Sequence, residues 1–591
     1  MKLRQRIVGL VLGTTVLATL AAVNAGSALA AAPPWEPDVN SIGVVTLYNA
    51  AGAVITGGNL SDVPFAAYAQ ASSAGRVGDK KATLVGKTPD HAQPTGAWSG
   101  QLLSASTTYP NSAAPAPLKT SSLPVVSLGS GDGDLTSYIQ AFPNNDSTAG
   151  YANVYQLRII TSGPGLPLPT TYYTADISVN SAAGTWSQVY PAPVVAVPAK
   201  YATVTPCRVF DTRQATPTAC SGAVAVAKAP LAAGATLSVR VAGVGGVPAD
   251  ATAVVMNLTA VGATRATYVT AWGHGGSRPG VSNLNVNNGQ AVPNLAIVPV
   301  GTGGLIDLYN AQGSVNLIGD VAGYFSASAS SANTTVTPCR VFDTRQATAT
   351  NCSGAVAVGL GKVGPGGVVN VKVAGVGGVP ATATAVVLNL TAVGASRATY
   401  VTAWPHGVAQ PVVSNLNVNN GQAVPNLAIV PVGSDGTIDL FNAQGSLDLI
   451  GDVAGYFAAG AGASNTTVTP CRVFDTRFIT PGDCSSAVAV GKAKVVAGGI
   501  LNVKVAGVGG VPANATAVVL NLTAVGASRA TYVTAWPHGV TRPGVSNLNV
   551  NNGQAVPNLA IVPIGSDGTI DLYNAQGTID LIGDVAGYFA P

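Results

Sequence analysis

The sequence predicts an all-β protein: an N-terminal β-sandwich-like domain, followed by three tandem β-sandwich modules of jelly-roll or Greek-key type. Two observations predict this class. Segments that alternate apolar and polar residues, and short apolar runs bounded by Gly, Pro and Asn, recur along the chain, and no helical periodicity exceeds two turns. After residue 200 the pattern also repeats three times at a constant spacing of 132 residues. β-barrel modules are the alternative architecture for the repeats.

Three long motifs define the repeat, and each returns without insertion or deletion. Val-Thr-Pro-Cys-Arg-Val-Phe-Asp-Thr-Arg begins at Val204, Val336 and Val468; Ser-Asn-Leu-Asn-Val-Asn-Asn-Gly-Gln begins at Ser282, Ser414 and Ser546; Gly-Asp-Val-Ala-Gly-Tyr-Phe begins at Gly319, Gly451 and Gly583. A repeat of this length has the size of a whole domain. We therefore expect tandem beads, each with its own core, over 203–325, 335–457 and 467–589. Short Ala/Ser/Gly segments of flexible composition join them.

Within a module we expect about eight strands in ~122 residues. The clearest are Leu284–Val286, Val386–Leu390, Leu427–Val430 and Leu501–Val505. Asn551-Asn552-Gly553 predicts a hairpin turn, because Asn and Gly tolerate positive φ, and Tyr309–Gly313 predicts a second hairpin with a longer turn.

Residues 33–197 form a different domain, which contains no cysteine. Val44–Tyr48, Tyr155–Ile159 and Tyr173–Val179 have strand patterns, and Asp134–Phe142 predicts one short helix. This domain is therefore also expected to be mostly β.

Residues 1–30 have the features of a secretory signal peptide. Three basic residues precede the apolar segment Ile7–Val23, and Ala28-Leu29-Ala30 provides a small-residue cleavage site. No other segment approaches the ~20 apolar residues of a spanning helix, and the chain ends without a hydrophobic tail. We expect a mature protein that is secreted, extracellular or associated with the cell envelope, with no transmembrane anchor after signal cleavage.

The six cysteines fit an oxidising compartment. They form three pairs with a constant spacing of 13 residues, and although six cysteines allow 15 connectivities, the repetition favours one: Cys207–Cys220, Cys339–Cys352 and Cys471–Cys484. A metal site is the rival interpretation, but no second pair or nearby His completes a set of four ligands. We expect no metal and no other cofactor.

The low charge excludes several function classes. Only 9% of residues are charged, against roughly 25% in ordinary soluble proteins. Removing the three basic residues of the signal peptide brings the formal net charge from +4 to +1, which offers no basic surface for nucleic acid. The only glutamate is Glu36, so neither a zincin helix nor a Glu/Glu glycosidase pair is present. Each module has a net charge close to zero, so we expect hydroxyls, amides and backbone groups to provide most of the hydrogen bonds between its surface and water.

The motifs also carry a resemblance to a known kind of protein. The repeats, with their Val-Phe-Asp-Thr-Arg, Ala-Gly-Val-Gly-Gly-Val-Pro and terminal Asp-Val-Ala-Gly-Tyr-Phe, resemble a β-rich module of secreted proteins of actinobacterial type. The front domain resembles one that precedes Ig-like or similar β repeats, on the motifs Trp35-Glu-Pro-Asp38, Pro64-Phe-Ala-Ala-Tyr68, Ser73-Ala-Gly-Arg76 and Tyr151-Ala-Asn-Val-Tyr-Gln-Leu-Arg158. The resemblance implies an extracellular, envelope-associated location. It brings no established activity and no catalytic residues.

An aromatic segment is the most suggestive candidate site. In Thr399-Tyr-Val-Thr-Ala-Trp-Pro-His406, the side chains of Tyr400, Thr402 and Trp404 share one face of a strand. Exposed, such a face is a platform on which sugar rings stack; alternatively, the aromatics belong to the core and the histidine caps a loop. The candidate platform residues are Tyr268, Trp272, His274, Tyr400, Trp404, His406, Tyr532, Trp536 and His538.

Asparagines on one face of the next strand form the second candidate. Amides match sugar hydroxyls because they offer both a donor and an acceptor, but they also wet the outside of a strand in a protein of low charge. The residues are Asn283, Asn285, Asn415, Asn417, Asn547 and Asn549. Asp343 and Arg345, which share a strand face, are interpreted as a buried ion pair that fixes the disulfide loop.

These features favour a non-enzymatic extracellular or cell-surface protein of structural or adhesion type, whose three modules act as a stalk or a multivalent binder. A carbohydrate- or cell-wall-binding protein that uses the Tyr/Trp platforms is the alternative, and a hydrolase with its active site in 33–197 is a third hypothesis. The expected partners are cell-wall or other polysaccharides, or other surface proteins, and not nucleic acid.

Overall fold

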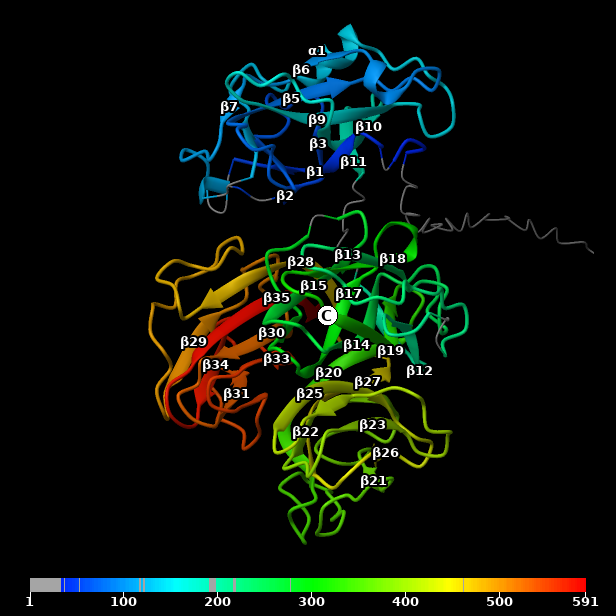
Figure 1. The fold of residues 1–591 in the computed structure, drawn as a ribbon, viewed down its shortest axis with the longest axis vertical. Coiled ribbons are helices and arrows are strands. Elements are labelled where there is room, and N and C mark those ends of the chain that lie inside the picture. Colours follow the sequence, from blue (N-terminus) through cyan, green and yellow to red (C-terminus); the bar gives the residue numbers. More distant parts are fainter. Residues whose placement is uncertain are drawn as a thin grey trace, which may run out of the picture.

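The computed structural model describes residues 33–591, except 37, 51, 53, 116–117, 121–122, 191–197, 216–218, 277 and 461. The expected signal peptide lies outside the described residues. In Figure 1 nearly all the regular secondary structure is strand, and the described residues contain a single α-helix. The predicted all-β class is confirmed.

The front domain is organised around β1 (Ser41–Tyr48), which pairs with β10 in parallel and with β4 in antiparallel orientation. Helix α1 (Leu135–Ala141) forms where the sequence predicts it, because the Asp134 carboxylate accepts the Ser137 N–H as an N-cap. The other elements are β2 (Val54–Ile55), β3 (Gly57–Asn59), β4 (Tyr68–Ala71), β5 (Lys81–Lys87), β6 (Gly100–Leu102), β7 (Thr107–Thr108), β8 (Val125–Ser127), β9 (Val154–Ser162), β10 (Tyr172–Asn180), β11 (Thr185–Tyr190) and the 3₁₀ turns Thr95–Ala97 and Leu118–Thr120.

The first module is a jelly roll. Its eight strands form an inner sheet in the order β17-β14-β19-β12 and an outer sheet in the order β13-β18-β15-β16, so the first strand pairs with the last and the second with the seventh. The strands are β12 (Lys200–Asp211), β13 (Thr236–Arg240), β14 (Ala253–Val261), β15 (Thr267–Gly273), β16 (Leu284–Val286), β17 (Ala291–Pro299), β18 (Leu305–Asn310) and β19 (Asn316–Ser326), with a 3₁₀ turn at Thr302–Gly304.

The other two modules repeat this order, each again with two separate sheets. The second contains β20 (Ser331–Asp343), β21 (Val368–Lys372), β22 (Ala383–Val393), β23 (Thr399–Pro405), β24 (Leu416–Val418), β25 (Ala423–Pro431), β26 (Thr437–Asn442) and β27 (Asp448–Ala459). The third contains β28 (Ser464–Asp475), β29 (Ile500–Lys504), β30 (Ala517–Val525), β31 (Thr531–Pro537), β32 (Leu548–Val550), β33 (Ala555–Pro563), β34 (Thr569–Asn574) and β35 (Asp580–Ala590). Each module is a β-sandwich, as predicted, with a core of its own between the sheets.

Both predicted hairpins are wrong. The Asn551–Gly553 turn connects β32 in the outer sheet to β33 in the inner sheet, and the Tyr309–Gly313 turn connects β18 to β19 in the same way. The glycines do adopt the positive φ that the turns require, 71° at Gly553 and 57° at Gly313. The motif predicts a chain reversal, but the strands that follow pair with other strands of the sandwich.

The modules are not independent beads, because they share a further apolar core. Figure 1 shows them as three lobes around a common centre, where the chain also ends. Phe325, Phe457 and Phe589 occupy equivalent positions and meet there, with ring centroids 6.0 to 6.1 Å apart. Tyr201, which is fully buried, stacks on this trio 4.4 Å from Phe457. A rigid threefold head replaces the expected string of flexible beads.

The joins between modules are strands of the same assembly. Ser331 pairs with both Tyr201 and Ala459, so the inner sheets of the first two modules form one eight-stranded sheet. Backbone bridges Ala199–Asn465 and Asn333–Ala463 connect this sheet to the third module. The short Ala/Ser/Gly segments are therefore fixed by hydrogen bonds, although their composition is typical of linkers.

A cyclic network of buried amides connects the modules around the same axis. Asn426 Nδ2 donates to Asn257 Oδ1 of the first module over 2.7 Å, and Asn426 Oδ1 accepts the backbone N–H of Leu295 over 2.9 Å. The equivalent bonds run from Asn558 to Asn389 and Leu427, and from Asn294 to Asn521 and Leu559. Each module contacts both others, so the ring closes after three copies.

At one end of the axis the three inner sheets leave a small hollow of about 40 Å³. Its walls are the equivalent segments 290–293, 422–425 and 554–557, which carry Gln, Ala, Val and Pro. A volume of this size accommodates one or a few water molecules and not a sugar ring.

Candidate functional site

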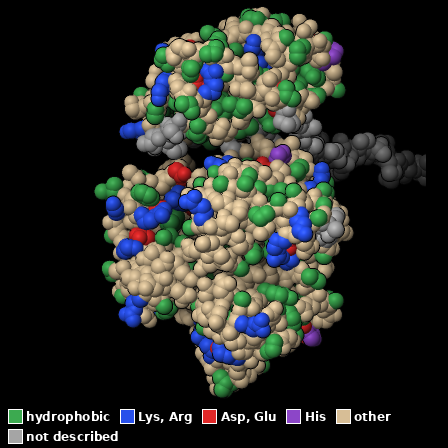
Figure 2. Space-filling model, in the orientation of Figure 1, with side chains coloured by type: hydrophobic (Ala, Val, Ile, Leu, Met, Phe, Trp, Pro, Cys, Tyr) green, Lys and Arg blue, Asp and Glu red, His purple; other side chains and the backbone are tan. Residues whose placement is uncertain are grey.

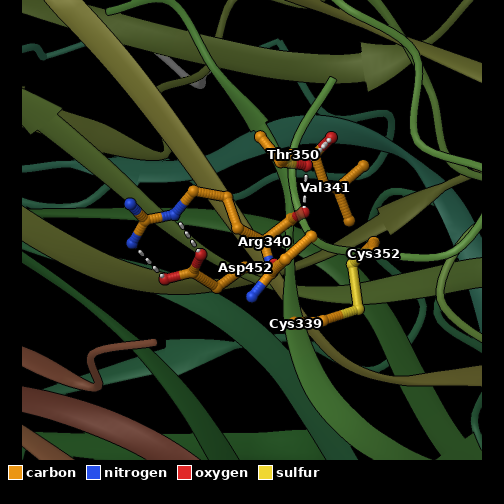
Figure 3. The surroundings of a disulfide bond; sticks show 7 residues. Cys339, Arg340, Val341, Thr350, Cys352 and Asp452 are labelled. Atoms are coloured by element: carbon orange, nitrogen blue, oxygen red, sulfur yellow. Dashed lines mark hydrogen bonds and ion pairs between the residues drawn. A yellow bond between two sulfur atoms is a disulfide. The ribbon is translucent and has the colours of Figure 1, made fainter. Parts of the chain in front are cut away.

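The disulfides form as predicted, one within each module, with S–S distances of 1.98 to 2.10 Å. Figure 3 shows the second one: Arg340, next to Cys339, points away from the disulfide and donates to Asp452 over 2.8 Å, while Thr350 donates to the backbone of Arg340. Arg345 pairs with the buried Asp343 over 2.6 Å, as the sequence suggested. Burial alone would raise the pKa of Asp343, but the bonds from Arg345 outweigh it and lower the pKa. The disulfide and these ion pairs therefore fix the backbone at this end of the module.

The outer sheet presents the aromatic segment as the strand periodicity predicts. On β15, Val269 and Ala271 face the core between the sheets, whereas Tyr268, Thr270 and Trp272 face outward. β23 and β31 repeat the arrangement in the other modules. The outward face is therefore the place to look for a ligand platform.

The tryptophans cannot serve as the predicted platform, because the loop after each strand covers them. Trp272 is only 7% exposed, and its Nε1 donates to the carbonyl of Gly276 in that loop over 3.0 Å. Thr270 Oγ1 holds the far end of the loop through the carbonyl of Val281. Trp404 and Trp536 are buried in the same way. The tryptophans are therefore buried, as the core interpretation expects, although they lie beneath the loop and outside the main cluster between the sheets.

The histidines border this loop and pair with carboxylates. His274 Nδ1 lies 2.8 Å from Asp307 Oδ1, and this hydrogen bond raises the pKa of His274. His406 and His538 make the same contact with Asp439 and Asp571. The histidines are half-exposed, and each ties the end of the strand to the neighbouring strand of the outer sheet.

The tyrosines are the aromatic residues that remain accessible. Tyr268, Tyr400 and Tyr532 are 39%, 41% and 37% exposed. Each has a second, half-buried ring beside it on the next strand: Tyr309 at 6.3 Å, Phe441 at 6.2 Å and Tyr573 at 6.2 Å. Of the predicted platform residues, therefore, only the tyrosines have a largely exposed aromatic ring. Each belongs to an aromatic pair that the sequence did not predict. We call these the three aromatic pairs.

The six asparagines are half-buried, and each makes hydrogen bonds within the protein, which neither interpretation of the motif predicts. Asn283 Oδ1 accepts the backbone N–H of Ala271 within the module over 2.7 Å. Asn285 Nδ2 donates to Ser282 and, at 3.5 Å, to Thr523 of the third module. Asn415 and Asn547 repeat the first contact, and Asn417 and Asn549 repeat the second with Thr259 and Thr391. The second asparagine of each Ser-Asn-Leu-Asn motif therefore forms a hydrogen bond to a neighbouring module.

The surface around these sites has little charge. On the face shown in Figure 2, uncharged polar side chains and backbone predominate, with Lys and Arg in scattered positions. This face therefore has the low density of charged side chains that the composition predicts.

In the front domain, the single glutamate belongs to a buried polar network. Glu36 accepts from Gln156 Nε2 over 3.1 Å, and Asp176, fully buried, accepts from Trp35 Nε1 over 3.3 Å. Burial raises the pKa of Asp176 well above its ordinary value, and the charge of Glu36 adds to the shift. Burial likewise raises the pKa of Glu36. Because solvent does not reach Asp176, the arrangement is that of a structural pair that holds a proton.

The front domain is expected to become more stable as the pH falls from 7 to 5. A carboxyl whose folded pKa is raised contributes stability that is present below its unfolded pKa and is lost as the pH rises through the folded pKa. The effect is at most about 1.4 kcal/mol per pH unit for one proton. Arg158 and Asp38 also lie in this network, 3.8 Å apart, and their opposite charges offset each other.

Calorimetry of the full chain between pH 5 and 7 measures this dependence, with D176N as the matched variant that cannot ionise. Asp79, Asp134 and Asp146 have lowered pKa values and lose their contributions only below about pH 4. A transition that keeps the same melting temperature throughout this range, or falls toward pH 5, would contradict the prediction.

Comparisons with known proteins give no family assignment. No family model matches the chain, and no curated protein matches it. Among solved structures, the chain is similar to the N-terminal CBM22-1–CBM22-2 tandem domain of Xyn10C from Paenibacillus barcinonensis, with 12% identity over 44% of this chain and 94% of that chain and a TM-score of 0.14. It is also similar to the triple jelly roll of an archaeal virus turret, with 7% identity over 66% of this chain and 90% of that one and a TM-score of 0.14. We draw nothing about ligands from either likeness.

Two further findings bear on location. Three disulfides are consistent with an extracellular protein. Within the described residues, no helix is long and apolar enough to cross a membrane.

Proposed function

We propose that the chain is a non-enzymatic, extracellular or envelope-associated binding protein, and that its three modules form a rigid head with three glycan-binding faces. The observation that carries the proposal is the threefold repetition of the aromatic pairs on the outer sheets. Each exposed tyrosine ring gives an apolar face of the kind on which a sugar ring stacks, beside a second ring that is tilted by 49° to 54° from it, and the polar surroundings suit hydroxyl-rich ligands.

The closed arrangement favours a multivalent head over a linear stalk. The modules surround an axis instead of extending end to end, and the amide ring and shared core fix their relative positions. Three weak sites at fixed separations raise the overall avidity by 10²-fold or more when a polymer reaches more than one of them. A polysaccharide meets this requirement because it repeats its own binding unit.

A sedimentation assay on insoluble cell-wall and plant polysaccharides tests the proposal. We expect the wild-type chain to be retained, and the triple variant Tyr268→Ala, Tyr400→Ala, Tyr532→Ala to lose at least tenfold in apparent affinity. Circular dichroism verifies that the variant is folded, which is expected because all three side chains are exposed.

The matched control removes exposed apolar surface elsewhere on the head. Phe478 and Ile479 in the third disulfide loop are 54% and 75% exposed, and F478A/I479A should bind as the wild type does. Retention of the tyrosine variant at the wild-type level, or no retention of the wild type on any polysaccharide, would overturn the glycan-binding proposal.

A further inference from the structure

Two of the three aromatic pairs carry an arginine that the sequence analysis did not single out. The Cζ atom of Arg278 lies 3.7 Å from the ring centroid of Tyr309, and that of Arg542 lies 3.6 Å from the ring centroid of Tyr573. Both arginines are exposed and belong to the loop that covers the tryptophan. In the second module, the equivalent residues are Gln410 and Phe441, so both the guanidinium and the phenol are missing there.

The arginines are not needed to hold the loop. In the second module, which lacks the arginine, Trp404 Nε1 still donates to the carbonyl of Val408 over 3.2 Å and Thr402 Oγ1 to that of Val413 over 2.6 Å. The corresponding bonds of the first module are 3.0 and 2.6 Å long. A cation–π contact on the surface adds only about 0.5–1 kcal/mol. The loop therefore folds alike with and without the arginine, and a structural role does not account for it.

The guanidinium groups have unused donors. Stacking occupies one face of the guanidinium plane and leaves its N–H groups, which lie in that plane, directed elsewhere. Among the described residues, no hydrogen bond or ion pair engages Arg278 or Arg542. The carboxylate on the neighbouring strand, Asp307, is already bonded to His274 and to Ser238. Each arginine thus presents a planar cation without an ion-pair partner among the described residues, stacked on the half-buried ring of the pair that includes Tyr268 or Tyr532, although the Asp483 carboxylate lies close to Gly280 in the same loop as Arg278.

The chemistry that matches this arrangement is a carboxylate attached to a sugar ring. A carboxylate accepts two parallel N–H bonds from a guanidinium, and the sugar that bears it would lie against the adjacent tyrosine. The second module, with Gln410 and Phe441, offers an amide and an apolar ring to a neutral unit.

We propose that the first and third modules each bind the carboxylate of an acidic sugar unit, such as a uronic acid in a polysaccharide, through Arg278 with Tyr268 and through Arg542 with Tyr532, and that the second module does not. This inference rests on the proposed glycan-binding function and names the class of sugar. The recognition is local, because the module surface as a whole is nearly neutral.

Affinity electrophoresis of the full chain through gels that contain one polymer each tests the inference. The probes are polygalacturonate, its fully methyl-esterified form, which keeps the ring and loses the charge, and dextran sulfate, which is polyanionic without carboxylates. We expect wild-type affinity for polygalacturonate to exceed that for the ester by at least tenfold and that for dextran sulfate by a similar factor. The variant R278Q/R542Q, which copies Gln410 of the second module, should lose this preference and keep its affinity for the ester.

The second module supplies the reciprocal variant. Q410R/F441Y should gain affinity for polygalacturonate, because it builds a third site of the same kind. Equal wild-type affinity for the acid and the ester, equal affinity for dextran sulfate, or an acid preference that survives in R278Q/R542Q would overturn this inference and leave the proposed function standing. No retardation on any polysaccharide, neutral or acidic, would overturn both.

Discussion

Replacing Asn426 with leucine is expected to lower the free energy of unfolding of the three-module head by about 3–7 kcal/mol. The Asn426 side chain is 1% exposed and makes three hydrogen bonds: to Asn257 Oδ1 over 2.7 Å, to the Asn415 carbonyl over 2.6 Å and from the Leu295 N–H over 2.9 Å. Leucine leaves Asn257 Oδ1 and the Leu295 N–H buried without a bond, at about 1–3 kcal/mol each, and the half-buried Asn415 carbonyl loses its bond at about 1 kcal/mol more.

Guanidinium denaturation of the full chain measures this loss, and N420A is the matched control because Asn420 is exposed in the following turn. The control should lie within about 0.5 kcal/mol of the wild type, as surface substitutions usually do. If N426L were as mild as N420A, the amide ring would contribute nothing to the assembly of the modules.

The second large effect is expected at the axis. Tyr201→Asn should cost about 3–5 kcal/mol, the range for truncating a fully buried aromatic side chain. Tyr201 packs 5.4 Å from Phe325 and 4.4 Å from Phe457, and the corresponding residues of the other copies are Asn333 and Asn465. One tyrosine thus fills a space that three equivalent positions surround.

The conservative variant Y201F separates packing from hydrogen bonding. It removes only the bond from the Tyr201 hydroxyl to the Ala322 carbonyl, 3.1 Å long, and should cost about 1 kcal/mol. Similar losses for Y201N and Y201F in the same denaturation experiment would show that the ring itself does not stabilise the centre.

Local chemistry allowed much of the fold to be predicted. Asp134 begins a helix because its carboxylate caps the Ser137 N–H, and the constant spacing of the cysteines predicts their pairing. The turn at Asn551–Gly553 shows where such rules stop. The residues determine that the chain reverses, whereas the choice of pairing partner depends on strands 30 or more positions away, such as β30 for β33.

The assembly of the modules was not predicted, although the sequence contains two signals of it. Asn294 interrupts the apolar run Val292–Val298, and an amide inside a buried strand requires a buried partner. Tyr201 differs from the Asn of the other two copies, which marks it as a position where the repeats are not equivalent. Neither signal identifies the partner, because the bonds cross between modules that are far apart in the sequence.

The candidate site likewise combines features that the sequence predicts with features that depend on contacts far apart in the chain. Strand periodicity placed Tyr268 and Trp272 correctly on one face, but it carries no information about the loop that covers the tryptophan. Arg278 was overlooked because a single arginine in a loop has no pattern. Only its stacking on Tyr309, repeated in the third module and absent from the second, distinguishes it.

The closed amide ring constrains how the gene can change in length. Near-identical tandem repeats recombine readily, and unequal exchange produces chains with two or four copies. A chain with two copies would expose unpaired amides and the apolar axis, and a fourth copy would find no open position in the ring. Viable length variants should therefore carry three modules or a multiple of three. The geometry of a few asparagines thus determines which changes in repeat number leave a protein that folds.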